Sequence, residues 1–315
     1  MDVVTIGETM LLFQPLEEKP LMYSSLYSKT IGGAESNVAI GLTRLGKQAR
    51  WIGCLGKDPF GDVIKATLAG ENVDISKVER DEINPTSIYF KEIYKVGEPC
   101  VYYYRKGSPS SKWGPEHVQE HWFVDAGHLH MTGITPALGE KTLDFTIACM
   151  RMAKSLGLTV SFDPNMRFKL WNEEKAKKAL VELISLCDIF MPGIDEAEFL
   201  LGKGNPENLA RKALQLGPQV VAMKLGSEGS LGMLKDGTTV KVSGEKVEKV
   251  VDTVGAGDAY AAGFLSIGVD GLDANNLEKA LERGNKMGAY IIQGKGDWES
   301  LPSLAQMEGI EIKVR

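Results

Sequence analysis

The sequence predicts an α/β fold, in which a parallel sheet has helices on both faces and a small β lid stands beside it. Short apolar runs alternate with amphipathic stretches along most of the chain, as strands and helices alternate around a parallel sheet. Two segments, 10–30 and 86–105, interrupt this alternation. The length of 315 residues suits one large domain with an insertion, or two domains.

The elements of the main domain follow in order along the chain. Buried strands are predicted at the apolar runs 3–7, 49–56, 126–133, 158–164, 187–192 and 219–226. Helices are predicted at the amphipathic stretches 35–46, 59–71, 137–156, 173–185, 195–201 and 207–216. Gly46 suits the residue after a helix and Pro59 suits a first turn, so both support these boundaries.

The two interrupting segments predict the lid. Residues 86–105 alternate apolar and polar positions, with Gly97 and Pro99 at a turn, which is typical of a β-hairpin. Residues 10–30 are mixed and contain two prolines. We therefore predict a core formed by 1–9, 31–85 and 109–315, and a lid formed by 10–30 and 86–108.

Composition and charge exclude several classes of protein. No apolar run approaches the roughly 18 residues of a membrane span, and the first residues lack the basic start of a signal peptide. A net charge of −6 argues against nucleic-acid binding. The cysteines are too far apart for a zinc site or a small disulfide framework. They are expected to be free thiols in a reducing cytoplasm: Cys54, Cys100, Cys149 and Cys187.

The strongest local signal is a glycine-rich turn that runs into a helix of small residues at 252–264. Gly255 and Gly257 allow unusual backbone angles, and the N–H groups at the helix start converge into an anion hole. Asp258 at its mouth is either a helix stabiliser or a base that accepts a proton from an attacking hydroxyl. If it is the base, the protein is an enzyme and not a non-catalytic ligand-binding sensor.

Other motifs of nucleotide and acyl chemistry are absent from the sequence. It contains no Walker-type P-loop and no nucleophile elbow. It also lacks a G-x-G-x-x-G after a strand, which argues against a dinucleotide-dependent oxidoreductase.

Two further clusters offer groups for a small polyol. In 31–37, a Gly-Gly pair opens a helix that carries Asn37, which could bind hydroxyls; the alternative is a tight turn before a packed helix. Residues 163–167 end a buried strand, where open α/β sheets bind ligands. Arg167 there suits a carboxylate or phosphate, or else a surface salt bridge.

The hairpin and two late glycine-rich turns complete the candidates. Tyr103 and Arg105 share one face of a strand, and Tyr89 on the partner strand could join them. The alternative is an aromatic stripe that only packs. The turns at 224–229 and 294–297 either line a nucleotide groove or are plain turns.

All the histidines lie close together in the sequence, at His117, His121, His128 and His130. His117 and His121, four residues apart on a predicted helix, could form a metal pair. No third ligand completes the set, and the other two lie on an apolar strand. We therefore predict no metal site here.

Taken together, the chain resembles the ribokinase-like (pfkB) carbohydrate kinases over essentially its whole length. Residues 32–46 and 252–264 match the two signatures of that family. Further stretches resemble the 2-keto-3-deoxygluconate kinases within it: the opening IGETM, 103–108, 163–171, 191–200 and 294–302.

The resemblance implies a ribokinase-like three-layer α/β/α core with a small β-sheet lid, ATP as phosphoryl donor and Mg²⁺. It implies that Asp258 is the base and that the N–H groups of Gly255, Ala256 and Gly257 form the anion hole. The implied substrate-binding residues are Gly33, Ala34, Asn37, Tyr89, Tyr103, Arg105, Arg167 and Asp258. The implied ATP-binding residues are Lys224, Gly226, Ser227, Gly229, Gly255, Gly257 and Asn285.

The resemblance also bears on metals. Glu196 matches the glutamate of the family's N-x-x-E motif, which organises Mg²⁺ through water. Gly193 stands where that motif has asparagine, and Pro109 stands where a small residue such as alanine is expected. A monovalent cation such as K⁺ near Asp252 is left open.

The arginines decide the expected substrate. Neutral sugars need hydroxyl partners, whereas Arg105 and Arg167 around one pocket favour a carboxylate and a locally positive pocket. We therefore predict ATP-dependent phosphorylation of 2-keto-3-deoxygluconate at its terminal hydroxyl, giving 2-keto-3-deoxy-6-phosphogluconate. The alternative is the same chemistry on fructose, ribose or 5-dehydro-2-deoxygluconate. The open edge of the lid hairpin predicts a homo-oligomer, with a dimer through the lid.

Overall fold

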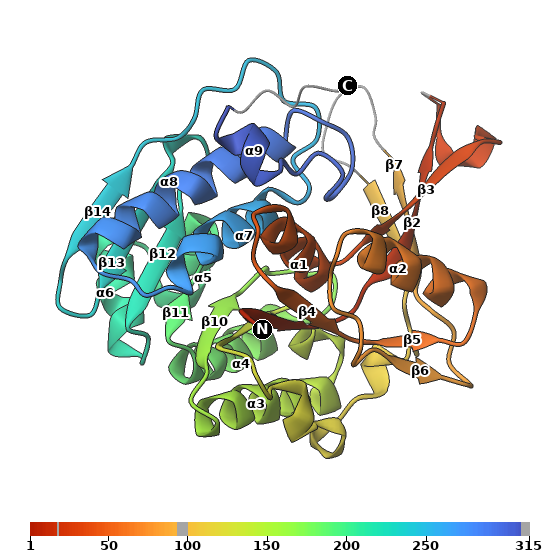
Figure 1. The fold of residues 1–315 in the computed structure, drawn as a ribbon, viewed down its shortest axis with the longest axis horizontal. Helices are drawn as coiled ribbons and strands as arrows, with labels where there is room; N and C mark the ends of the chain where they lie inside the picture. Colours follow the sequence, from red (N-terminus) through yellow and green to blue (C-terminus); the bar gives the residue numbers. More distant parts are fainter. Residues whose placement is uncertain (18, 93–99, 310–315) are drawn as a thin grey trace.

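The main sheet of the molecule has eight strands (Figure 1). The computed structural model describes residues 1–17, 19–92 and 100–309. Across the sheet the strands run β14 (Thr239–Val242), β13 (Ser230–Leu234), β12 (Val220–Lys224), β11 (Ile189–Phe190), β10 (Thr159–Asp163), β9 (His128–Thr132), β1 (Val3–Ile6) and β4 (Ala49–Ile52). The α/β fold class predicted from the sequence is confirmed.

One edge of this sheet corrects the prediction of a parallel sheet. Strands β4 to β12 are parallel, but β12 pairs with β13 and β13 with β14 in the antiparallel sense. The turn between β12 and β13 is too short for the crossover that parallel strands need. It contains the 3₁₀ turn η6 (Gly226–Glu228), and Gly229 follows it with a φ of +100°.

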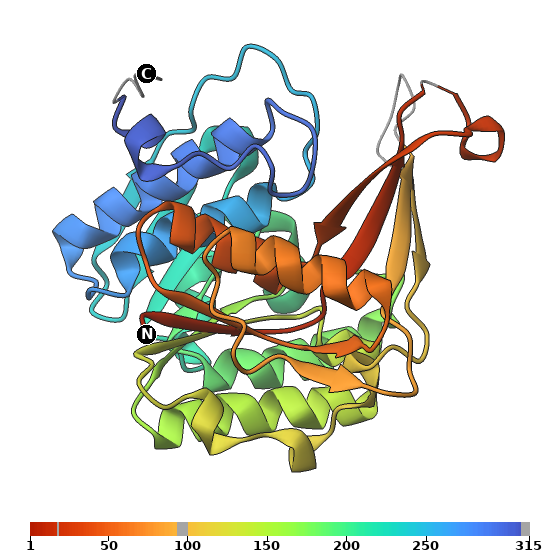
Figure 2. The ribbon, with the colours of Figure 1, turned by 45° about the vertical axis from the view of Figure 1, so that its right-hand side comes forward.

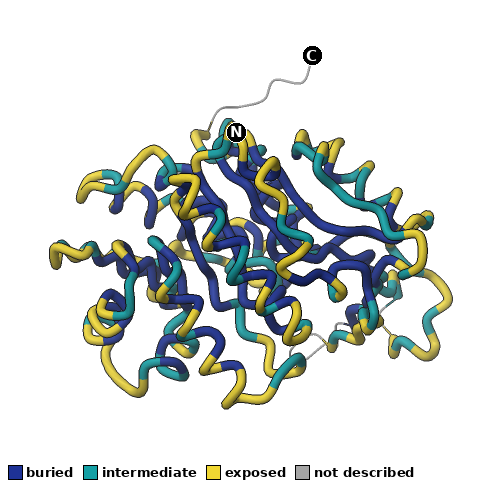
Figure 3. Tube along the Cα trace, turned by 90° about the horizontal axis from the view of Figure 1, so that it is seen from below, coloured by how far each residue is buried: buried dark blue, intermediate teal, exposed yellow. Residues whose placement is uncertain are grey.

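Helices cover both faces of the sheet (Figures 1 and 2). One face carries α1 (Ala34–Arg44), α2 (Pro59–Gly70), α7 (Ala256–Gly268), α8 (Ala274–Ile291) and the short α9 (Leu304–Met307). The other carries α3 (Glu140–Ser155), α4 (Glu173–Leu186), α5 (Ile194–Leu201) and α6 (Pro206–Gln215). The central strands lie buried between the two layers (Figure 3), because apolar side chains of β1 point alternately into each.

A second, four-stranded sheet projects from the body (Figure 2). Its order is β3 (Tyr27–Gly32), β2 (Met10–Pro15), β7 (Ile88–Glu92) and β8 (Cys100–Tyr104). Strands β7 and β8 are antiparallel, as the hairpin pattern predicted, while the turn at Gly97 and Pro99 lies outside the described residues. The division into core and lid at the predicted boundaries remains a prediction, and β3 runs on to Gly32.

Two local predictions are wrong. The expected strand 49–56 is divided into β4 and β5 (Cys54–Gly56), because β5 leaves the main sheet to pair with β6 (Glu79–Asp81). The histidines at 117 and 121 do not share a helix. They lie in two separate 3₁₀ turns, η3 (Pro115–His117) and η4 (Glu120–Trp122).

The remaining short turns are η1 (Leu21–Tyr23), η2 (Ser110–Lys112) and η5 (Pro136–Leu138), the last of which precedes α3. In the part of the chain that the structure describes, no helix has the length and apolarity needed to cross a membrane.

Candidate active site

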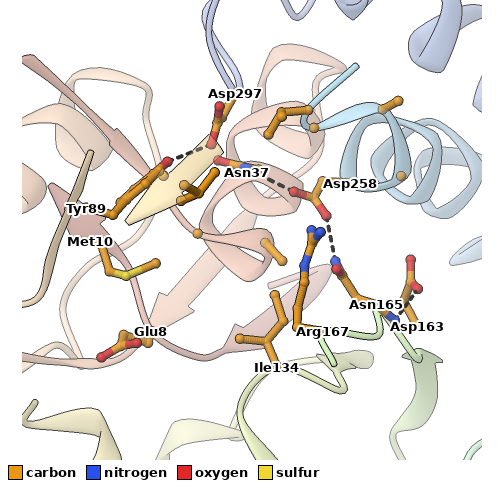
Figure 4. A pocket seen from close by; sticks show the side chains of 18 of the residues that line it. Glu8, Met10, Asn37, Tyr89, Ile134, Asp163, Asn165, Arg167, Asp258 and Asp297 are labelled. Atoms are coloured by element: carbon orange, nitrogen blue, oxygen red, sulfur yellow. Dashed lines mark hydrogen bonds between the residues drawn. The ribbon is translucent and has the colours of Figure 1, made fainter. Parts of the chain in front are cut away.

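A cavity of about 420 Å³ lies where the carboxyl ends of the main-sheet strands meet the lid (Figure 4). Its walls come from β10 and β12, from the first turns of α1 and α7, and from lid strands β7 and β8. Open α/β sheets bind ligands outside the carboxyl ends of their strands, so this is the place where the fold offers a site.

The first turn of α7 faces this cavity. Gly255, at its N-cap, has a φ of +83°, and a Cβ there would lie 2.3 Å from the carbonyl oxygen of Asp297. Only glycine fits this turn. The first N–H groups of a helix have no intrahelical partner and carry the positive end of its dipole. The N–H of Ala256 makes a long hydrogen bond of 3.4 Å to the Thr253 carbonyl. The backbone N–H groups of Gly255 and Gly257, on either side of it, are therefore the better donors for an anion.

Asp258 lies in the same turn, buried, with an amide on each carboxylate oxygen. Asn37 Nδ2 donates to Oδ2 at 2.8 Å, and Asn165 Nδ2 donates to Oδ1 at 3.1 Å (Figure 4). Asn37, predicted to bind hydroxyls, thus donates to Asp258, while its own Oδ1 is buried without a hydrogen-bond partner among the described residues.

The electrostatics of the cavity tune this carboxylate. Burial raises the pKa of Asp258 to about 6; the Asn37 hydrogen bond lowers it, the Asp163 charge raises it, and the positive charges of Arg167 and Lys224 lower it. A carboxylate with this pKa is ionised at neutral pH and is a better proton acceptor than an exposed aspartate.

Asn165 is a site residue that the sequence argument did not single out. It has a φ of +37°, a region where asparagine is among the more tolerated side chains. Its backbone N–H donates to Asp163 Oδ1 at 3.0 Å. The polar stretch after β10 was the available signal, although only Arg167 was chosen from it. Arg167 lines the cavity and is exposed.

Lys224 lies within the cavity, whereas its predicted place was the border of a nucleotide groove. Its Nζ donates to Asp163 Oδ2 at 2.5 Å and lies 3.7 Å from where a Gly257 Cβ would be. Beside it, Glu196 accepts the N–H groups of Met166 at 2.8 Å and Gly193 at 2.7 Å. With glycine at position 193, Glu196 caps its own helix. Burial raises the pKa of Glu196, and the Lys224 charge opposes this.

On the lid side, Arg105 is paired with an acid. Its Nε donates to Glu8 Oε2 at 2.8 Å, and its guanidinium lies 5.5 Å from the Tyr103 ring centre. Ser87 donates to the other Glu8 oxygen at 2.8 Å. Arg105, which was predicted to bind a substrate carboxylate, thus already has an acid of the protein as its partner.

The expectation of a locally positive pocket also needs correction. Five carboxyl groups and four cationic groups line the cavity: Glu8, Asp163, Glu196, Asp258 and Asp297, with Lys91, Arg105, Arg167 and Lys224. Three of these cationic groups, Lys91, Arg105 and Lys224, are ion-paired with acids of the same wall.

The glycines at the start of α1 allow close contacts. A Cβ at Gly32 would lie 1.9 Å from the Tyr89 hydroxyl, and one at Gly33 would lie 2.5 Å from the Glu8 carbonyl oxygen. Tyr89 donates to Asp297 Oδ2 at 2.6 Å, so its hydroxyl is directed at an acid of the cavity wall (Figure 4). Gly33 and Ala34 line the cavity next to Asn37.

Four predicted nucleotide-binding residues lie outside this cavity: Gly226, Ser227, Gly229 and Asn285. Three of them gather around the loop at 242–244: Asn285 Nδ2 donates to the Ser243 carbonyl at 3.2 Å, and Gly229 and Ser227 approach the same loop. The structure therefore brings these three together outside the lining of the Asp258 cavity.

Two of the histidines form a buried pair in the sheet. His128 Nε2 and His130 Nδ1 lie 2.7 and 2.8 Å from Ser161 Oγ. Burial lowers the pKa of each to about 3, so both are neutral. Within the described ranges, no three His, Cys, Asp or Glu side chains are grouped to hold a metal ion.

Comparison with known proteins identifies the family. The profile described as "pfkB family carbohydrate kinase" matches residues 1–304. The chain belongs to the pfkB family of carbohydrate kinases. Among curated relatives of this pfkB kinase, the 2-dehydro-3-deoxygluconokinase of Bacillus subtilis is 42% identical over 96% of this chain and 93% of its own. That of Thermoproteus tenax is 32% identical over 98% and 93%.

Solved structures agree with this assignment. A PfkB protein from Polaromonas has a TM-score of 0.88 and 38% identity, covering 98% of this chain and 99% of its own. A putative ribokinase II from E. coli in complex with ATP and Mg²⁺ has a TM-score of 0.88 and 27% identity, covering 98% of each. A Vibrio cholerae fructokinase double mutant with fructose, ADP and potassium bound has a TM-score of 0.85 and 27% identity, also covering 98% of each. The ribokinase-like fold is confirmed.

Proposed function

We propose that this pfkB kinase transfers the γ-phosphoryl group of ATP to the terminal hydroxyl of 2-keto-3-deoxygluconate (2-dehydro-3-deoxygluconate). The product is 2-keto-3-deoxy-6-phosphogluconate. The observation that carries the proposal is Asp258, buried at the mouth of a helix N-terminus and held by two amides inside a cavity shared by core and lid. The two curated relatives described above support the choice of substrate.

The chemistry follows from the position of Asp258. As the sugar oxygen attacks the γ-phosphorus and the bond to ADP breaks, the hydroxyl proton passes to the Asp258 carboxylate. The amide donors of Asn37 and Asn165 orient that carboxylate. Phosphoryl transfer needs little covalent help from the protein, so alignment and charge stabilisation supply most of the catalysis.

Charge on the moving phosphoryl group is met by two devices. We assign the anion hole to the N–H groups of Gly255, Ala256 and Gly257, with the dipole of α7 behind them. Lys224 adds a positive charge at the same place, because its Nζ lies 3.7 Å from where a Gly257 Cβ would be. Both are fixed before the reaction and need no reorganisation during it.

The cavity also has donors for Mg²⁺. Mg²⁺ prefers one or two carboxylates, several waters and substrate phosphates. Asp163 and Glu196 supply carboxylates on the same wall as Lys224, and their hard oxygens fit this ion. We assign Glu196 to hold it through water. When bound, Mg²⁺ would neutralise phosphate charge.

Sugar binding is assigned to the opposite wall: Gly33, Ala34, Asn37, Tyr89, Tyr103, Arg105 and Arg167. Arg167 is the group best placed for the carboxylate, because Arg105 already pairs with Glu8. The same pairing favours one second candidate, a neutral keto sugar such as fructose, because a pocket with a single available guanidinium makes the carboxylate less decisive. The nucleotide is assigned to Lys224 and to the residues gathered around 242–244.

The test is ADP release with ATP and Mg²⁺ over 2-keto-3-deoxygluconate, 5-dehydro-2-deoxygluconate, fructose and ribose. We expect kcat/KM to be highest for 2-keto-3-deoxygluconate, with phosphate found on the terminal hydroxyl by NMR. Arg167→Ala should raise the KM for the acid by about 10–100-fold, the value of a charged hydrogen bond, and leave the KM for ATP unchanged. An equal or higher kcat/KM for fructose would select the second candidate.

The remaining assignments concern the whole molecule. We propose that 10–30 and 86–108 act as a lid over the core, which would exclude water from the reaction. Tyr102 and Tyr104, exposed on edge strand β8, support a dimer formed through the lids. Scattering in solution would test it. The four free cysteines support work in a reducing compartment such as the cytoplasm.

A further inference from the structure

A buried lysine of the lid reaches into the core beside the anion hole. Lys91 lies on β7, and its side chain is completely buried. Its Nζ donates to Asp252 Oδ2 at 2.5 Å and to Asp297 Oδ1 at 3.0 Å. A lysine can stay charged without water only when carboxylates surround it. Burial alone would lower the pKa of Lys91, but the two carboxylates outweigh it and the pKa is raised.

The two acids have no carboxylate oxygen left without a partner. Asp252 Oδ1 accepts the Val254 N–H at 3.1 Å, and Asp297 Oδ2 accepts the Tyr89 hydroxyl at 2.6 Å. The remaining oxygen of each acid is bound to Lys91. The Lys91 ammonium lies within hydrogen-bond distance of both acids, so a monovalent metal ion that bridged them would have to displace it. With Lys91 in this position, the two acids therefore do not fit K⁺ between them.

Both acids touch the turn that opens the anion hole. Asp252 starts this turn and holds the Val254 amide. The carbonyl oxygen of Asp297 lies against Gly255 so closely that no Cβ would fit between them. A cation that neutralises these two carboxylates therefore also fixes the position of the turn. Here that cation is the ammonium group of Lys91, which comes from the lid.

We propose that Lys91 is a built-in substitute for a monovalent cation, whose ammonium neutralises Asp252 and Asp297 and positions the anion-hole turn from the lid. The part of this proposal that concerns catalysis rests on the proposed phosphoryl transfer at Asp258. Lys91 is a positioning residue in this scheme, because its Nζ is bound to the two acids and it acts on the reaction through the turn. The kinase then needs no K⁺, and the anion hole is complete only when β7 is seated on the core.

The test compares the wild-type protein with Lys91→Ala in tetramethylammonium, potassium, ammonium and methylammonium chloride at equal ionic strength. The melting temperature without substrates is one measurement, and kcat and KM are the other. Wild-type values should be the same in all four salts. In tetramethylammonium, Lys91→Ala should melt lower and lose about 10–100-fold in kcat, because the anion-hole donors are no longer held in place. Potassium, ammonium or methylammonium should restore both.

Controls separate this idea from its alternatives. Lys57→Ala removes an exposed lysine paired with Glu82 and should respond to no salt. If Lys91→Ala does not fold, the double variant Lys91→Ala/Asp297→Asn, which keeps the local charge balance, should fold and should gain the response to potassium.

Three results would overturn the proposal. One is a wild-type protein that needs potassium. Another is a Lys91→Ala or double variant that is indifferent to all four salts. The third is a defect confined to the KM of the sugar, which would indicate direct contact with substrate. The melting experiment uses no substrate, so a wrong assignment of the sugar leaves this test intact.

Discussion

Two buried carboxyl groups lie on neighbouring helices and have opposite surroundings. Asp258 on α7 opens onto the cavity and has an amide donor on each oxygen. Glu35 on α1 is sealed in the core. Its Oε1 accepts hydroxyls from Thr132 at 2.7 Å and Thr135 at 3.3 Å, and its Oε2 has no hydrogen-bond partner among the described residues.

Both carboxyl groups are buried, and burial raises the pKa of each. Burial raises the pKa of Asp258 to about 6 and that of Glu35 to about 7, and the charge on Asp258 adds to the shift at Glu35. The Asn37 amide and the positive charges of Arg167 and Lys224 oppose the effect of burial on Asp258, which is mostly ionised at pH 7 and opens onto the cavity. Glu35, with hydroxyl donors on one oxygen, is about half protonated at pH 7. Burial raises the pKa of both acids, so access to the cavity and the two amide donors are what distinguish Asp258.

The largest expected effect comes from removing the proposed base, Asp258. Asp258→Asn should lower kcat by about 10²–10⁴-fold, because the attacking hydroxyl loses its proton acceptor. Nucleotide binding measured by calorimetry should persist. Asp195→Asn removes an exposed carboxylate from the first turn of α5 and serves as the matched control, with kcat unchanged. Near-normal turnover by Asp258→Asn would refute the assignment.

The pH dependence of kcat/KM tests the raised pKa of Asp258. Since the base must be ionised and its pKa is about 6, kcat/KM should be flat above about pH 7 and fall tenfold per pH unit well below pH 6. Arg167 lowers that pKa, so Arg167→Ala should move the acid limb to higher pH. An acid limb at the ordinary aspartate value, in either protein, would contradict the role of burial.

The amides around Asp258 should matter less than the carboxylate itself. Asn165→Ala removes the hydrogen bond to Oδ1 and should cost about 10–100-fold in kcat, the value of a hydrogen bond to a charged group. Asn205→Ala, which removes the N-cap of α6 instead, should lower stability by about 1 kcal/mol and spare kcat. Equal kcat values for the two variants would mean that Asn165 does not position the base.

Glu35→Gln should affect stability more than catalysis. The pKa of Glu35 is about 7 in the folded protein, against 4.5 as its ordinary value. The folded state therefore binds the proton more tightly than the unfolded state, and this contribution is lost as pH rises from about 4.5 through about 7. The loss reaches about 3 kcal/mol in the wild type and is absent in Glu35→Gln.

Urea unfolding at about pH 5 and about pH 8 measures this difference. The stability of Glu35→Gln relative to wild type should increase with pH, while kcat changes far less than in Asp258→Asn. The exposed Glu282→Gln should show no such trend. A pH-independent difference for Glu35→Gln would place its carboxyl in an ordinary, ionised state.

The sequence predicted those parts of the site that are encoded locally. Gly255, Gly257 and Asp258 lie within four residues, so their spacing alone predicts an anion hole with an acid at its mouth. The alternation of apolar runs and helices predicted the core for the same reason. The hairpin edge at β13 was missed because a single apolar run does not show which way its neighbour runs.

The ion pairs of the cavity could not be predicted from the sequence, because the fold brings together residues that are far apart in the chain. Lys224 and Asp163 are 61 residues apart, Arg105 and Glu8 are 97 apart, and Lys91 and Asp297 are 206 apart. Lys224 and Arg105, which were predicted to bind ligands, are each neutralised by an acid of the protein. Glu8 lies in the quoted IGETM stretch, which was the one signal that could have pointed to it.

Gly32 has a consequence for how this enzyme can change. Because Gly32 has no side chain, the Tyr89 hydroxyl and the Asp297 carboxylate can both lie against its Cα. Three stretches that are distant in the chain thus meet at this residue. Any replacement would push the lid and the 297 loop apart together. In a saturation library selected for growth on the substrate, glycine should be invariant at this position even though it has no functional side chain.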